Sequence, residues 1–200
     1  MRNRLSSVRA HGALALLLLS PLSFVPAAHA TENGNTSYLE AYQGTVAGLT
    51  HRLPRLMSSS IKVRINRFST EDETQTISSL LEKKTPEALQ NWLGDRLLGT
   101  VQIGETLPQP IAAAWSFEDD AGRHLVIVVP RPISIREVFQ NRRSVDYPYT
   151  VAQLDLEADG HGSGELNAAA RLRMAKDGSI EFNPLGVIPL RILNLRPLEG

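Results

Sequence analysis

Residues Leu154 to Met174 read LDLEADGHGSGELNAAARLRM, and this stretch decides the fold class. Its acidic pair, Asp155 and Glu157, alternates with two leucines, which predicts a strand with one buried and one solvated face. After the glycines the alternation returns, and a second apolar face is expected from Leu166, Ala168, Ala170, Leu172 and Met174. Positive φ angles for the turn are expected from Gly160, Gly162 and Gly164. The stretch therefore predicts a long antiparallel hairpin.

The same stretch partly matches a calcium-binding loop. Asp155, Glu157 and Asp159 stand at ligand positions of the EF-hand template, but the twelfth position holds Leu166 where a bidentate glutamate is required. An EF-hand also needs flanking helices, and these flanks alternate as strands do. The three acids thus stay as weak candidates for a cation site beside the simpler interpretation, a solvated strand face.

Other strands and one helical hairpin follow from the same rules. Ile61, Val63 and Ile65 alternate with polar residues, after a predicted loop that includes serines 58–60. Thr70 and Glu73 have the spacing of a capping box, and Pro86 suits the first turn of a second helix. Strands are expected near residues 98–103, 111–117, 125–129, 150–156 and 166–174, with an Asp177–Gly178 turn into a strand through Ile180 and Phe182 and one further strand ending by Arg196.

These elements predict an α+β protein that is mainly β. About eight or nine strands should form an antiparallel barrel or a curved sheet pair, with the helical hairpin near residues 71–95 inserted after the second strand. A short helix is also expected near Ser134 to Phe139, because Ser134 and Glu137 repeat the capping-box spacing.

The N-terminal segment indicates export. Arg2, Arg4 and Arg9 precede a short apolar run and then small residues, which is typical of a signal peptide over residues 1–30. Residues 31–60 read as a polar N-terminal segment with a weak first strand, and residues 61–200 as a single β-rich domain. No segment of the mature chain has the roughly 20 apolar residues of a membrane helix.

Charge and cysteine content narrow the function classes. Without the signal arginines the chain has 18 basic and 21 acidic residues, a net charge of −3, which gives no electrostatic reason to expect nucleic acid. The absence of cysteine excludes disulfides and thiolate catalysis. No motif calls for a cofactor.

The richest candidate site lies in residues 130–150, PRPISIREVFQNRRSVDYPYT. Arginine forks and tyrosine hydroxyls can clamp a carboxylate or phosphate. The candidate ligand-binding residues are Arg131, Arg142, Arg143, Asp146, Tyr147 and Tyr149, with Trp92 of the helical hairpin as a candidate pocket wall. The simpler interpretation is that Asp146 pairs with a nearby arginine and that Pro148 fixes the entry to an edge strand, with the tyrosines packing on either face. In this interpretation Trp92 belongs to the core.

Histidine spacing argues against zinc. His51, His124 and His161 are far apart in the chain and none forms a chelating pair. His124 lies beside Glu118, Asp119 and Asp120, so a metal-binding or general-base role stays open for it, beside the simpler interpretation of an ordinary surface histidine. Ser163 lacks the flanking sequence of a nucleophile elbow.

Four segments in order, IKVRINRFSTEDE, PRPI, RSVDYPYT and DGHGSGEL, resemble a family of small exported bacterial proteins of unassigned function. The resemblance covers about residues 61–196 and implies a single exported domain. It assigns no catalytic residue.

Three functions are compatible with these patterns. The first is a non-enzymatic periplasmic or secreted domain that binds a small molecule or an envelope protein. The second is a hydrolase that uses scattered carboxylates or His124. The third is a structural or assembly role in the envelope, with residues 31–60 as a docking arm.

Overall fold

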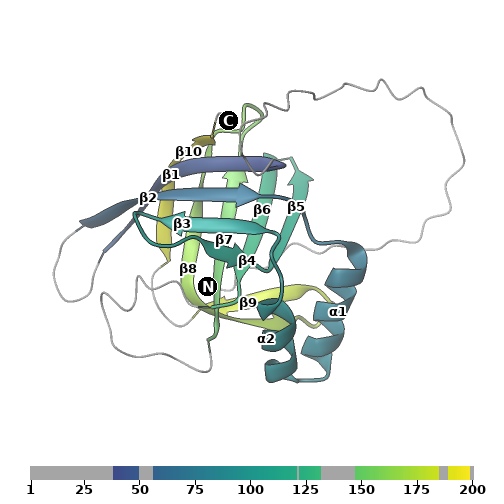
Figure 1. The fold of residues 1–200 in the computed structure, drawn as a ribbon. Coiled ribbons are helices and arrows are strands. Elements are labelled where there is room, and N and C mark those ends of the chain that lie inside the picture. The colour runs from purple at the N-terminus through teal and green to yellow at the C-terminus, as the bar shows by residue number, and fades with distance from the viewer. Residues whose placement is uncertain (1–37, 50–55, 121, 132–146, 185–188, 199–200) are drawn as a thin grey trace, which may run out of the picture.

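A computed structural model describes residues 38–49, 56–120, 122–131, 147–184 and 189–198. Ten strands and two helices lie in these ranges (Figure 1). Their bounds are β1 Glu40–Leu49, β2 Leu56–Ile65, α1 Glu71–Glu82, α2 Pro86–Gly94, β3 Gly99–Ile103, β4 Gln109–Ile111, β5 Ala113–Asp119, β6 Gly122–Val129, β7 Tyr149–Leu156, β8 Gly162–Met174, β9 Ile180–Pro184 and β10 Leu190–Pro197.

The sheet is antiparallel and nearly closes into a barrel. Its strand order is β4-β3-β2-β1-β10-β8-β7-β6-β5, with β9 paired to β8 alone. The two ends of this order, β4 and β5, are consecutive in the chain and separated by Ala112. That residue's amide donates to the Val128 carbonyl of β6 at 2.8 Å. The segment that we predicted as one strand over residues 111–117 thus pairs first with β3 and then with β6, and this change of partner closes the sheet.

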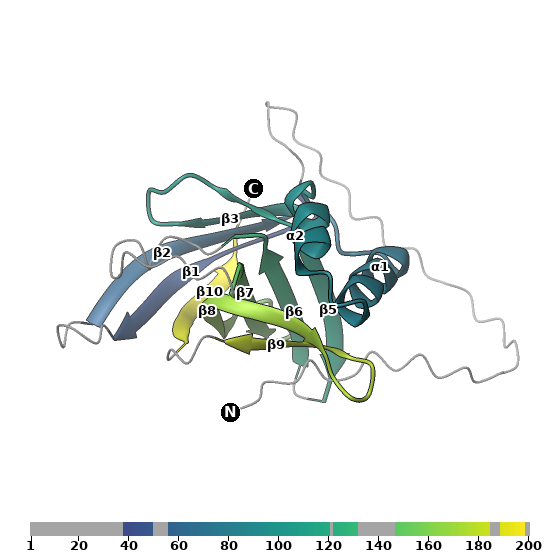
Figure 2. The ribbon, with the colours of Figure 1, turned by 90° about the horizontal axis from the view of Figure 1, so that it is seen from below.

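The predicted helical hairpin is confirmed between β2 and β3. Thr70 caps α1 through its side chain, and the Glu73 carboxylate accepts from the Thr70 amide at 3.0 Å. The hairpin lies beside β5 and β9 and away from β10, as Figures 1 and 2 show. It packs on the outer side of the sheet, where Ile77, Leu89 and Leu93 are buried with residues of β6 to β9.

A bulge in β8 moves its side chains from one face of the sheet to the other. The pairing of β7 with β8 shifts between Tyr149 and Val151, which face Ala170 and Asn167. Leu166 therefore points into the barrel, whereas Ala170 and Leu172 pack outside, under the helices. The single apolar face predicted for residues 166–174 is wrong at this bulge, because one extra residue reverses the alternation.

The first strands also extend further than the sequence indicates. Serines 58–60 lie in β2 rather than in a loop, because β1 pairs with β2 along its whole length. Residues 40–49 and 56–60 are thus part of the same sheet as the rest of the protein, which places them inside the domain and not in a separate arm.

Several predictions lie outside the described residues. These are the signal peptide, the helix near Ser134, and the candidate site residues Arg142, Arg143 and Asp146. Among the residues that are described, neither helix is long and apolar enough to cross a bilayer.

Candidate functional site

The interior of the barrel is filled with apolar side chains. Leu125, Ile127, Leu154 and Ile192 are fully buried there, together with residues of β1 to β4 and β10. The described side chains that face the interior are buried against one another, and this packing holds the strands together. Candidate sites must therefore be sought on the outer surface.

A second bulge shapes the outer face of β10. Against β8, Leu193 and Asn194 lie opposite the single residue Ser163, and against β1, Asn194 and Leu195 lie opposite the single residue Gly44. Asn194 has a φ of 51°, a left-handed conformation that asparagine tolerates better than most residues. A Cβ atom at Gly44 of β1 would lie 2.9 Å from the Leu193 carbonyl oxygen, so only glycine lets the two strands approach here.

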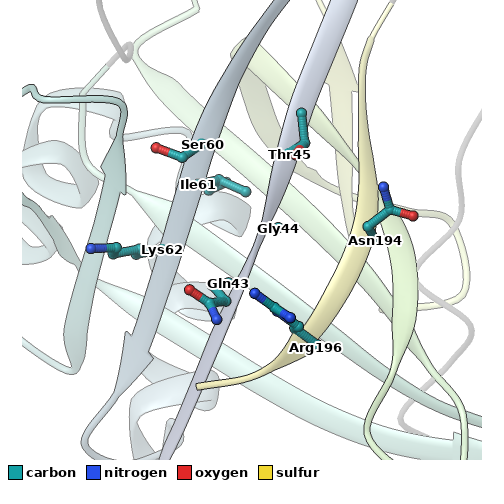
Figure 3. Close-up of a pocket in the computed structure, with 8 residues that line it drawn as sticks. All are labelled: Gln43, Gly44, Thr45, Ser60, Ile61, Lys62, Asn194 and Arg196. Carbon is teal, nitrogen blue, oxygen red and sulfur yellow. The ribbon is translucent and has the colours of Figure 1, made fainter. Parts of the chain in front are cut away.

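The bulge leaves a shallow hollow of about 220 Å³, open to solvent. It is lined by Gln43, Gly44, Thr45, Ser60, Ile61, Lys62, Asn194 and Arg196 (Figure 3). Arg196 points toward Gln43, whose amide oxygen can accept from its Nε at 3.2 Å and from Nη2 at 3.3 Å once the amide is turned to face it. Lys62 stands at the rim and extends to the other side of β2.

The strands around this hollow are basic. Strands β4, β3, β2, β1 and β10 contain one carboxylate, Glu40, which pairs with Arg123 at 2.7 Å. The same strands contain Lys62, Arg64, Arg191 and Arg196. Arg191 pairs with Glu165 of β8, whereas no ion pair within the described residues involves the other three.

We call this surface the basic face. It consists of the outward side chains of β2, β1 and β10 around the hollow: Ser60, Lys62, Arg64, Gln43, Thr45, Asn194 and Arg196. Lys62, Gln43 and Arg196 form one row across the three strands. Neither helix lies over it, because the hairpin packs near β5 and β9 (Figures 1 and 2).

The predicted arginine and tyrosine clamp is only partly described. Arg131 is exposed just after β6. Tyr149 is buried in the outer cluster under the helices, and this burial raises the pKa of its hydroxyl to about 12. Tyr147 contacts Arg171, whose guanidinium lies 5.3 Å from the ring centre. Burial makes Tyr149 a core residue here, and its hydroxyl is not presented to a ligand in solvent.

Trp92 also packs against the outer cluster. Its ring centre lies 4.0 Å from the guanidinium carbon of Arg96. The tryptophan thus helps to attach the helices to the sheet.

His124 is held between two aspartates on the outer face of β6. Its Nδ1 lies 2.7 Å from Asp155 and its Nε2 lies 3.0 Å from Asp119, while the ring stacks on Phe117 at 5.2 Å. The hydrogen bonds to Asp155 and then to Asp119 raise the histidine pKa above its usual 6.5. Because both ring nitrogens are engaged, neither is available to take a proton from a nucleophile.

The acids of the glycine hairpin face solvent, as their alternation predicts. Asp155 and Glu157 are exposed, and Leu154 and Leu156 are buried. Asp159 accepts from the His161 amide at 2.9 Å, which lowers its pKa. In the described part of the chain no cluster of three or more acids and histidines is arranged to hold a metal ion.

The comparisons with known proteins returned nothing. No family model, no curated protein and no solved structure matches this chain.

The basic face was not among the sites predicted from the sequence. Its signal was the near absence of carboxylates from residues 56–65, 99–111 and 190–197, which becomes meaningful only when these segments are known to be neighbours.

Proposed function

We propose that this protein is an exported, non-enzymatic binding domain that takes an anionic ligand on its basic face. The observation that carries the proposal is a set of three cations, Lys62, Arg64 and Arg196, which form no ion pair with other described residues and lie on the face that holds a hollow built by a β-bulge. Export rests on the signal-like residues 1–30 and on the family resemblance.

The surface location follows from the packing of the barrel. A small-molecule carrier would need an interior cavity, and the interior is filled with apolar side chains. Bulges are frequent next to binding sites because they redirect side chains and interrupt strand pairing. Arg196 follows the bulge in β10 by two residues and is thereby placed beside the hollow.

The alternative functions gain less support from the geometry. A hydrolase would need a free base, and both nitrogens of His124 are engaged by aspartates. A structural role in the envelope agrees with the filled barrel, but it gives no reason for unpaired cations to gather on one face.

Nuclear magnetic resonance can test the anion site directly. The purified, ¹⁵N-labelled protein would be titrated with sodium sulfate and, at matched ionic strength, with sodium chloride. We expect sulfate, and not chloride, to shift the amide signals of Gly44, Asn194 and Arg196, because a divalent anion gains most from an arginine fork.

Variants separate specific binding from general screening. The double variant Lys62→Gln and Arg196→Gln should lose the sulfate response, whereas Lys176→Gln, in the exposed turn between β8 and β9, should keep it. Equal responses to the two salts, or a sulfate response that survives in the double variant, would overturn the proposal.

A further inference from the structure

We propose that the ligand of the basic face is an acidic polysaccharide chain that lies across β2, β1 and β10. This inference rests on the proposed anion-binding function and adds the class of ligand. It is carried by the spacing of the cations, by the neutral side chains between them and by the lack of aromatic anchors.

The three cations are too widely spaced for one small anion to contact all of them. Lys62 and Arg64 stand two residues apart on β2, about 7 Å along the strand. Arg196 is in the row of Lys62 but two strands away, at about 10 Å. Lys62 also extends away from the hollow, so the charges are spread over the face (Figure 3). A chain that carries several negative charges can meet all three positions at once.

Neutral hydrogen-bonding groups fill the space between the cations. Gln43, Thr45 and Ser60 line the hollow, and Asn194 completes it at the bulge. Amides and hydroxyls both donate and accept hydrogen bonds, as do the hydroxyl groups of a sugar. The mixture of such groups with cations therefore matches a ligand that is rich in hydroxyls and also negatively charged.

The composition of the face disfavours other polyanions. Protein interfaces concentrate aromatic and apolar anchors at their centre, and single-stranded nucleic acids stack their bases on aromatic rings. None of the described residues that line the hollow is aromatic, Tyr38 lies against Arg64 at the margin of the face, and the apolar neighbour of the hollow is Leu193, which is 41% exposed. An acidic peptide is the closest competitor, since it would share the charge but not the hydroxyls.

Calorimetric titration with defined probes distinguishes these ligands. The probes are a galacturonic acid hexamer, its methyl ester, the monomer, and poly-L-glutamate of matched charge. We expect the hexamer to bind at least about tenfold more tightly than the monomer, because linked groups engage the face together. The methyl ester should show no binding, and poly-L-glutamate should bind more weakly than the hexamer.

Arg64 provides the variant that is specific to an extended ligand. It lies on the basic face but does not line the hollow, and its guanidinium rests 5.4 Å from the Tyr38 ring. Arg64→Gln should weaken hexamer binding by about three- to tenfold, in the range of a single charged contact, and should reduce the sulfate response less than the Lys62→Gln and Arg196→Gln double variant does. Lys176→Gln should change neither.

The outcomes separate this inference from the proposed function. Sulfate binding at the hollow without tighter hexamer binding, or with tighter binding of poly-L-glutamate, would overturn the polysaccharide and leave the anion site standing. Hexamer binding that is insensitive to Arg64→Gln would also overturn it. If neither sulfate nor any of the polymers bound, both the anion site and the polysaccharide ligand would be overturned.

Discussion

At the scale of single residues, glycines and one histidine shape the end of the β7 and β8 hairpin. Gly160 alone among the three hairpin glycines has a positive φ, of 80°. Gly162 and Gly164 lie in β8, where a Cβ atom would press into the carbonyl oxygens of Asp155 and Gln153. Turn chemistry therefore requires one glycine, and close strand approach requires the other two.

His124 should make the stability of the protein depend on pH. Its folded pKa lies above the unfolded value of 6.5 because of Asp155 and Asp119. The stabilisation is therefore complete below pH 6.5 and is lost as the pH rises through the folded pKa. Chemical unfolding between pH 5 and pH 9 should show this loss in the unmodified protein and not in His124→Gln.

The turn histidine provides the control for this effect. His161→Gln, with a side chain 58% exposed, should retain the same loss of stability with rising pH. If His124→Gln followed the same pH profile as the unmodified protein, the two aspartates would not be the source of the pH dependence.

At the scale of elements, Glu73 ties the two ends of the helical hairpin together. Its carboxylate accepts from both terminal nitrogens of Arg67 at 2.8 Å and from Arg96 at 2.7 Å. Hydrogen bonds from Arg67, before all other causes, lower the Glu73 pKa to about 2. One residue thus ties the entry to α1, the helix itself and the end of α2.

Removing that charge should loosen the hairpin. At pH 7 we expect Glu73→Gln to lower the free energy of unfolding by about 1–2 kcal/mol, because it removes a charged hydrogen-bond network that solvent partly screens. The Glu73 contribution is present above pH 4.5 and is lost as the pH falls toward its folded pKa of about 2. Urea unfolding measures both effects.

A second glutamate of the same helix is the matched control. Glu82, exposed in the last turn of α1, forms no ion pair with another described residue, and Glu82→Gln should change stability by less than about 0.5 kcal/mol. Equal effects of the two variants would contradict the anchoring role of Glu73.

At the scale of the whole molecule, two apolar clusters share the strands of one sheet. The inner cluster fills the barrel, and the outer cluster joins β6 to β9 with the helices. Strands β6 and β7 contribute to both, because alternate residues face opposite sides. The clusters should therefore unfold together.

An interior truncation tests this coupling. Leu154 is fully buried in the barrel, and Leu154→Ala should cost about 2–5 kcal/mol. The two tryptophans, Trp92 and Trp115, report on the outer cluster. For Leu154→Ala, the free energy of unfolding measured by tryptophan fluorescence and that measured by far-ultraviolet circular dichroism should fall by the same amount. The control is Leu107→Ala, at a side chain 80% exposed, which should have little effect on stability. Separate unfolding transitions for the two probes would contradict a single cooperative unit.

The sequence by itself determined the local structure. Alternating patterns identified most strands, the Thr70 capping box placed α1, and the Asp177 turn reversed the chain, since each depends on neighbours within a few residues. Only the tertiary structure decided closure at Ala112, the change of face within β8 and the gathering of Lys62, Arg64 and Arg196. These features arise from pairing between distant segments, and one inserted residue or a change of strand partner alters which side chains meet.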